Sequence, residues 1–134
     1  MTPFGARIRE LRCQRGVTLK QMAVDLEVSS AYLSALEHGK RGQPSRMLVR
    51  QICAYFGIFW DEADELERLA GISHPRIVVD TAGLSPKATL LANELARNIR
   101  RLDNGMLDRL LQLLDGEAPT NRQISEKSSA LPPP

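Results

Sequence analysis

Apolar residues recur at helical spacing between residues 18 and 40. Residues three and four positions apart lie on the same side of a helix, so the spacing predicts short helices over 19–26 and about 29–38. Their inward positions are Leu19, Met22, Ala23, Leu26, Leu33 and Leu36. Between them, Val28 is expected to turn the chain back into the core, and the Ser29 hydroxyl to cap the second helix. The pattern therefore predicts two helices joined by a tight turn.

The second of these helices has an outer surface of small and polar residues. They are Ser30, Ala31, Tyr32, Ser34 and Ala35. Gly39 follows the last turn, where a left-handed residue commonly ends a helix, and Lys40 and Arg41 come next. Cations at a helix C-terminus suit both the helix dipole and a phosphate backbone. We therefore predict that the second helix enters a DNA groove.

Over residues 4–58 the chain resembles the Cro/CI-type, or XRE, helix-turn-helix family. The matching pieces are Arg-Ile-Arg-Glu-Leu-Arg at 7–12, Arg15-Gly16, Thr18, Met22-Ala23, Val28-Ser29, Leu36-Glu37-His38-Gly39-Lys40 and Pro44-Ser45. The resemblance implies an all-α, five-helix, lambda-repressor-like DNA-binding domain, in which an Arg12–Glu37 pair locks the first helix to the recognition helix. It implies a core of Ile8, Leu11, Met22, Leu26, Val28, Leu33, Leu36, Leu48, Ile52 and Phe56.

The resemblance also implies which residues contact double-stranded DNA. Base edges are read from Ser30, Ala31 and Ala35, and phosphates are held from Thr18, Tyr32, Ser34, His38 and Lys40. The chain departs from the family at Leu19, where Gln is frequent, and neither Ser30 nor Ala31 supplies the long amide that pairs with adenine. We therefore expect specificity to depend on Arg41, Gln43 and Arg46 and on DNA shape. With the Ser29 cap, these residues form the candidate DNA-binding set.

The charge distribution agrees with that assignment. The 134 residues carry a net charge of +2. Residues 1–58 contain nine Lys and Arg against four Asp and Glu, whereas residues 59–74 contain one against five. The basic part is the part that carries the motif, as phosphate binding requires. Apolar residues make up 43% of the chain with few aromatics, which fits helices packed by aliphatic side chains.

The pattern of apolar residues predicts two more helices, and the second of them is acidic. Pro44 and Ser45 open a predicted helix that runs to about Gly57, and an acidic helix is expected over 61–70, with acids that cannot face DNA. Trp60 is expected to cover the seam between this domain and the C-terminal part of the chain. These elements place the DNA-binding domain at residues 1–72.

Residues 73–116 are predicted to form an extended linker and a helical dimerisation region. The β-branched run at 77–79 favours a short extended piece, which either lies as coil or pairs with its copy in a second subunit. Apolar residues then repeat as in a helix-packing seam over 86–102, and Asp103 caps a second, largely apolar helix ending near 115. The candidate dimer contacts are Ile77, Val79, Ala88, Ala92, Leu95, Ile99, Leu102, Met106, Leu110 and Leu113. The alternative is that both helices fold back on the first domain, and residues 117–134 are expected to be disordered.

The sequence gives little support for metal binding, redox switching or catalysis. Cys13 and Cys53 lack Cys or His at metal-ligand spacing, so we expect a reduced, buried structural pair and no metal or cofactor; a redox switch would require facing sulfurs. No catalytic motif appears, so no enzyme is predicted. Neither a signal peptide nor a membrane span is visible, which favours the cytoplasm.

Three functions fit these features. The first is a transcriptional regulator that represses palindromic operators as a homodimer. The second is an antitoxin whose C-terminal helices hold a toxin. The third is a helical interaction module that does not touch DNA, which the basic N-terminal part disfavours.

Overall fold

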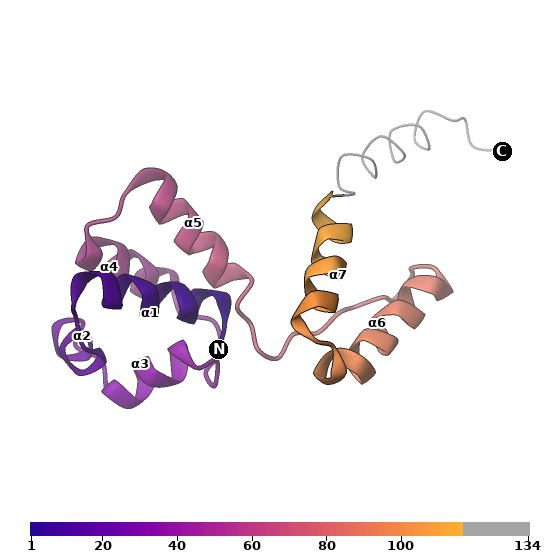
Figure 1. Ribbon diagram of the computed structural model, residues 1–134, viewed down its shortest axis with the longest axis horizontal. Coiled ribbons are helices and arrows are strands. Elements are labelled where there is room, and N and C mark those ends of the chain that lie inside the picture. Colours follow the sequence, from indigo (N-terminus) through magenta and orange to yellow (C-terminus); the bar gives the residue numbers. More distant parts are fainter. Residues whose placement is uncertain (117–134) are drawn as a thin grey trace. The chain divides into compact units, whose positions relative to one another are not determined.

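The computed structural model describes residues 1–116, and every regular element in that range is a helix. The described residues fall into two units, 1–78 and 79–116 (Figure 1). The predicted all-α fold is therefore confirmed. The predicted tail over 117–134 lies outside the described residues.

The first unit is the five-helix domain. Its helices are α1 (Pro3–Arg15), α2 (Leu19–Asp25), α3 (Ser30–Glu37), α4 (Arg46–Phe56) and α5 (Trp60–Gly71). In Figure 1, α2 and α3 lie on one side of α1, and α4 and α5 complete the domain. The helix-turn-helix is α2 and α3 with their connecting turn.

Hydroxyl caps determine where four of these helices begin. The capping residues are Thr2, Thr18, Ser29 and Ser45. Each side-chain oxygen accepts a hydrogen bond from a backbone N–H of the first helical turn, at 3.0 or 3.1 Å. Two helices end on left-handed glycines, Gly16 and Gly57, both at φ +64°. The helix boundaries thus follow from local sequence.

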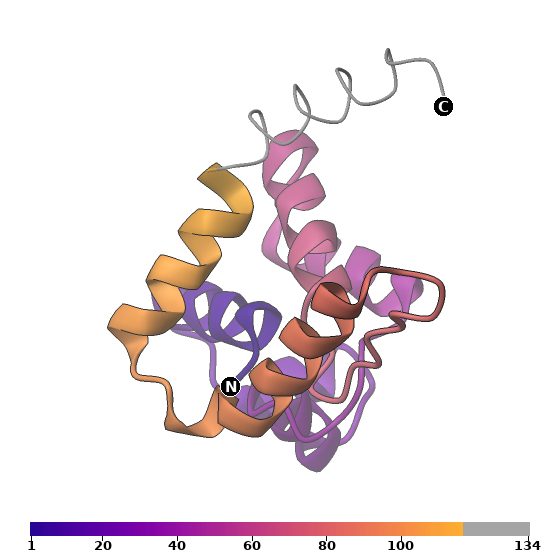
Figure 2. The same cartoon turned by 90° about the vertical axis from the view of Figure 1, so that its right-hand side faces the viewer.

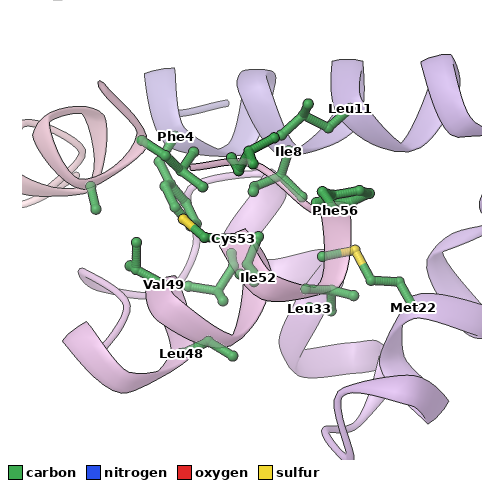
Figure 3. Packing of buried hydrophobic residues seen from close by; sticks show 14 of the residues in the cluster. Phe4, Ile8, Leu11, Met22, Leu33, Leu48, Val49, Ile52, Cys53 and Phe56 are labelled. Atoms are coloured by element: carbon green, nitrogen blue, oxygen red, sulfur yellow. The ribbon is translucent and has the colours of Figure 1, made fainter. Parts of the chain in front are cut away.

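The core of this domain joins all five helices (Figure 3). Its buried hydrophobic residues are Phe4, Ile8, Leu11, Met22, Ala23, Leu33, Leu36, Leu48, Val49, Ile52, Cys53, Phe56, Ile58, Leu66 and Ala70. Of the expected core, only Leu26 and Val28 are half-buried rather than buried. Phe4, Val49, Ile58, Leu66 and Ala70 are also buried and were not in the expected core; the last two show that α5 packs against the domain in spite of its acidic sequence.

One expectation about a single residue is wrong, and another stays a prediction. Trp60 is 87% exposed and does not belong to the core of the first unit, and its expected place at the seam with the C-terminal part stays a prediction. It begins α5 with φ +54°, in the left-handed region. Cys13 is exposed and Cys53 is buried, so only Cys53 acts as a small core hydrophobe. Burial raises the pKa of the Cys53 thiol.

The second unit contains α6 (Pro86–Asn98), a 3₁₀ turn (Ile99–Arg101) and α7 (Asn104–Gly116). The hydroxyl of Ser85 and the carboxylate of Asp103 cap the two α-helices. Figures 1 and 2 show α6 and α7 diverging as a V, and neither helix buries a residue.

The segment between the units has no regular structure. Ile77, Val78 and Val79 are all exposed and form no strand in the part of the chain that is described. The coil alternative therefore describes this segment within one chain. No helix within residues 1–116 is long and apolar enough to cross a membrane.

Candidate nucleic-acid interface

A close backbone contact holds α3 against α1. A Cβ atom placed on Gly5 would lie 2.2 Å from the carbonyl oxygen of Glu37 and 2.7 Å from its Cα. Such distances are far below van der Waals contact, so only glycine permits this approach. The α1–α3 spacing therefore depends on the missing side chain at position 5.

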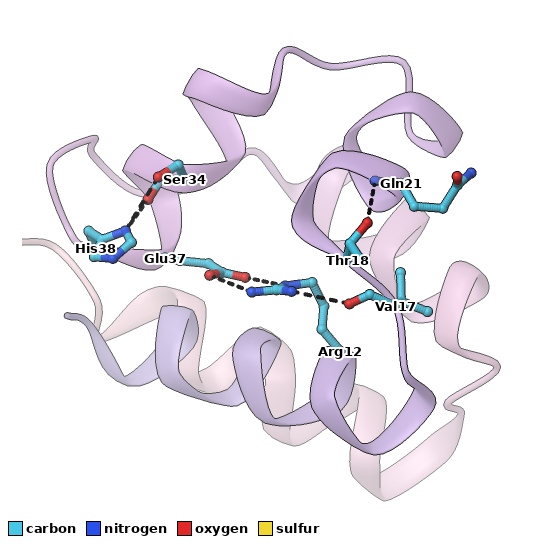
Figure 4. A network of polar contacts seen from close by, with 7 residues as sticks. All are labelled: Arg12, Val17, Thr18, Gln21, Ser34, Glu37 and His38. Carbon is cyan, nitrogen blue, oxygen red and sulfur yellow. Dashed lines mark hydrogen bonds and ion pairs between the residues drawn. The ribbon is translucent and has the colours of Figure 1, made fainter.

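An ion pair fixes the same two helices beside that contact (Figure 4). Arg12 Nε donates to Glu37 Oε1 at 2.7 Å, and Nη2 donates to Oε2 at 3.1 Å. The third donor, Nη1, binds the Val17 carbonyl at 3.1 Å. Glu37 is only 2% exposed, and its hydrogen bonds raise the pKa of the Arg12 guanidinium. Arg12 thus ties α1, the start of the helix-turn-helix and α3 together.

The outer surface of α3 faces solvent at its N-terminal end. Ser29, Ser30 and Ala31 are exposed, and Tyr32, Ser34 and Ala35 are half-buried. The first three side chains are short, so a DNA backbone or base edge can approach the helix closely. The candidate reading residues therefore share one accessible surface.

The segment after α3 places two cations beside this surface. The backbone N–H groups of Lys40 and Arg41 both donate to the Ala35 carbonyl, at 2.9 and 3.3 Å. The Arg41 guanidinium carbon lies 5.9 Å from the centre of the Tyr32 ring, within cation–π range. Arg41 is thereby held over the outer side of α3. Gln43 and Arg46 are also exposed.

Thr18 and His38 lie at opposite ends of the helix-turn-helix (Figure 4). The Thr18 hydroxyl accepts from the Gln21 N–H at 3.0 Å, and its own proton remains available to a phosphate oxygen. His38 Nδ1 lies 2.8 Å from the Ser34 carbonyl oxygen. Both side chains are exposed and polar.

One hydrogen bond in this region was not predicted from the sequence. The Tyr55 hydroxyl donates to Asp25 Oδ2 at 2.6 Å and joins α4 to α2 across thirty positions of sequence. This bond raises the pKa of Tyr55 to about 12. A sequence pattern carries no signal for a pair so far apart.

The candidate dimer contacts differ in how far their side chains are exposed. Ala88, Ala92, Leu102 and Leu110 are half-buried. Leu95, Ile99, Met106 and Leu113 are exposed by 42–57%, and Ile77 and Val79 are exposed in the coil. Among residues 1–116, no three His, Cys, Asp or Glu side chains gather as a metal site.

Comparison with known proteins bears on the same region. Residues 3–69 match a family model described as a helix-turn-helix domain. An uncharacterized HTH-type transcriptional regulator, RghRB of Bacillus subtilis (strain 168), is 44% identical over 54 residues, which are 40% of this chain and 39% of that protein. The HTH-type transcriptional repressor RghR of the same organism is 28% identical over 129 residues, which cover 88% of this chain and 95% of that protein. No solved structure matches the chain.

Proposed function

This chain belongs to the helix-turn-helix family of DNA-binding transcriptional regulators, and we propose that it acts as a dimeric repressor of palindromic operators. The observation that carries the proposal is the exposed surface of α3 with Arg41 held beside it. The similarity to RghR, which is named a repressor, extends over most of both chains. Repression of this kind requires occupancy of a promoter and no catalytic step, and we expect it to take place in the cytoplasm.

On this proposal, α3 lies in the major groove. Ser30 offers a hydroxyl to base edges, and the methyl groups of Ala31 and Ala35 suit contact with thymine methyls. Arg41 is long enough to reach a guanine edge or a phosphate beside the helix, and its contact with Tyr32 limits the conformations it must give up on binding.

The remaining candidates would hold the phosphate backbone. Thr18 and His38 flank the helix-turn-helix, and Lys40, Gln43 and Arg46 follow α3, all of them exposed. Each phosphate neutralised by a cation releases counterions, so binding should weaken steeply as salt rises.

The dimer is proposed for the α6–α7 unit because its two helices bury nothing between them. Four exposed apolar side chains belong to the predicted seam; they are Leu95 on α6, Ile99 in the 3₁₀ turn, and Met106 and Leu113 on α7. A V of two helices with no buried residue lacks a core of its own, and a second copy would supply one. Dimerisation would also place two α3 helices on half-sites about 34–36 Å apart, the spacing of one DNA turn.

DNA binding is tested with duplexes selected by the wild-type protein from a random-sequence pool and followed by fluorescence anisotropy. Arg41→Gln should lose about 1–3 kcal/mol of preference for the selected sequence if Arg41 reads a base. Arg9→Gln, an equal charge change at an exposed position on α1, is the matched control and should retain the preference. Equal losses in both variants, or no wild-type binding in dilute buffer, would overturn the proposal.

The dimer is tested by light scattering on the full chain. Leu95 lies in the predicted seam, whereas Leu90 lies outside it on the same helix, and the two are 42% and 61% exposed. Leu95→Glu should therefore yield monomers with weakened operator binding, and Leu90→Glu should remain dimeric. A monomeric wild type, or dissociation by Leu90→Glu alone, would contradict the assignment.

A further inference from the structure

A polar hollow lies beside the C-terminal end of α3. Its volume is about 260 Å³, and its lining includes His38, Gly39, Ser73 and His74. That volume is several times the roughly 30 Å³ that one liquid water occupies, so a phosphate group with its hydration fits. Both histidines in the chain's sequence line this one hollow.

His74 is held there by the residue before it. The Ser73 hydroxyl accepts a hydrogen bond from the Phe4 N–H at 2.9 Å and donates to the Leu69 carbonyl. Ser73 is only 4% exposed, so the chain is fixed as it leaves α5. A Cβ on Gly42 would lie 3.9 Å from His74 Cε1, which places the ring beside the basic segment after α3.

The hydrogen bond of His38 determines which protonation state can bind an anion. A carbonyl oxygen only accepts, so the 2.8 Å contact with the Ser34 oxygen requires the proton on Nδ1. In the neutral ring, Nε2 is then an acceptor and repels a phosphate oxygen. Only the imidazolium form donates from Nε2, so His38 supports phosphate binding when protonated.

The charges around the hollow favour an anion. No Asp or Glu lines it among the residues that the structure describes. Lys40 and Arg41 follow Gly39 and Arg76 follows Pro75, while Glu37 is turned inward onto Arg12.

We propose that His38 and His74 together form a binding site for one phosphate of the DNA backbone, which extends the interface from α3 to the segment after α5. This inference rests on the proposed DNA binding and adds His74 to the contact set. Because a protonated imidazole adds a charge-assisted donor to a phosphate oxygen, protonation of these two side chains strengthens operator binding.

The test uses a labelled duplex selected by the wild-type protein and measures its Kd by anisotropy at about pH 8 and about pH 6. Wild type should bind roughly tenfold more tightly at the lower pH, the size of one charge-assisted hydrogen bond. His74→Gln and His38→Gln should each flatten this dependence, because Gln donates without titrating. Replacing both histidines with alanine should also lower the salt slope near pH 6 by about 0.9, for the one phosphate contact that the two rings share.

The outcomes separate the two proposals. If the wild-type protein binds no duplex at any pH, the proposed function itself is refuted. Normal binding with an unchanged pH profile in both Gln variants would overturn the histidine site alone, and thermal melting of each variant checks that the fold is retained. Inorganic phosphate, followed by the NMR shifts of the two imidazoles, distinguishes a free anion; shifts with phosphate and none with the duplex would also overturn the site.

Discussion

Replacing Gly5 with alanine tests whether the α1–α3 contact sets the position of the recognition helix. The new Cβ would lie 2.2 Å from the Glu37 carbonyl oxygen, whereas ordinary contact begins at 3.4 Å, so α3 must retreat by about 1.2 Å. The obstructing atoms are backbone, so a side-chain rotation cannot relieve the clash. Overpacking of this kind costs about 1–3 kcal/mol and occasionally more.

An opposing term limits the net effect. Alanine favours a helix over glycine by about 1 kcal/mol, and Gly5 lies within α1. We expect a net loss of about 2 kcal/mol, because the retreat of α3 also strains the 2.7 Å Arg12–Glu37 bond. For a domain of this size, that loss corresponds to a Tm lower by roughly 8–16 °C.

The assay is thermal and urea unfolding followed by circular dichroism. Ala6→Gly is the matched control, since Ala6 is exposed on the same helix and reports the propensity term without a clash. Anisotropy should show weaker operator binding by Gly5→Ala even where the protein is fully folded. A variant as stable as wild type would refute the reasoning, because the helices would then tolerate the added carbon.

Further predictions concern the other ties. Glu37→Ala should lower the free energy of unfolding by about 3–5 kcal/mol, because it leaves Arg12 without its partner; urea denaturation of this variant and of the double alanine variant, which should recover part of the loss, checks the reason. Because the pKa of Tyr55 is raised from 10 to about 12, its hydrogen bond to Asp25 stabilises the fold fully below pH 10 and this stabilisation is lost as the pH rises toward about 12. Urea denaturation should therefore show that the free energy of unfolding falls more for wild type than for Tyr55→Phe over that range. Ser73→Ala should cost about 1–3 kcal/mol by leaving the Phe4 N–H unsatisfied, as melting would show.

The helix-turn-helix could be predicted from sequence because its signals are local. The hydroxyls of Thr18 and Ser29 cap the N–H groups three residues onward, and the apolar spacing of α2 and α3 reports which side is inward. These features need no knowledge of the rest of the fold. The boundaries of both helices were accordingly close to those observed.

Residues whose surroundings come from distant segments could not be predicted in this way. Gly5 resembles a weak point within a helix until α3 is seen against it, 32 positions later in the sequence. Cys13 and Trp60 have apolar side chains that local pattern assigns to the interior, yet both are exposed and no other element of the first unit covers them. The proposed phosphate site includes His74 because the neighbouring Ser73 is hydrogen-bonded to the start of α1, a contact between residues 69 positions apart.

The residues that position α3 differ from those that we propose contact DNA. Glu37 and Gly5 are buried and fix α3 from its inner side, whereas Ser30, Ala31 and Arg41 are exposed and contribute little to the core. Substitutions on the outer side should therefore alter which sequence is bound while the free energy of unfolding stays within about 0.5 kcal/mol. Substitutions on the inner side should weaken every sequence alike, because they move the whole helix. This difference is the measurable consequence of a rigidly held helix with an exposed outer surface.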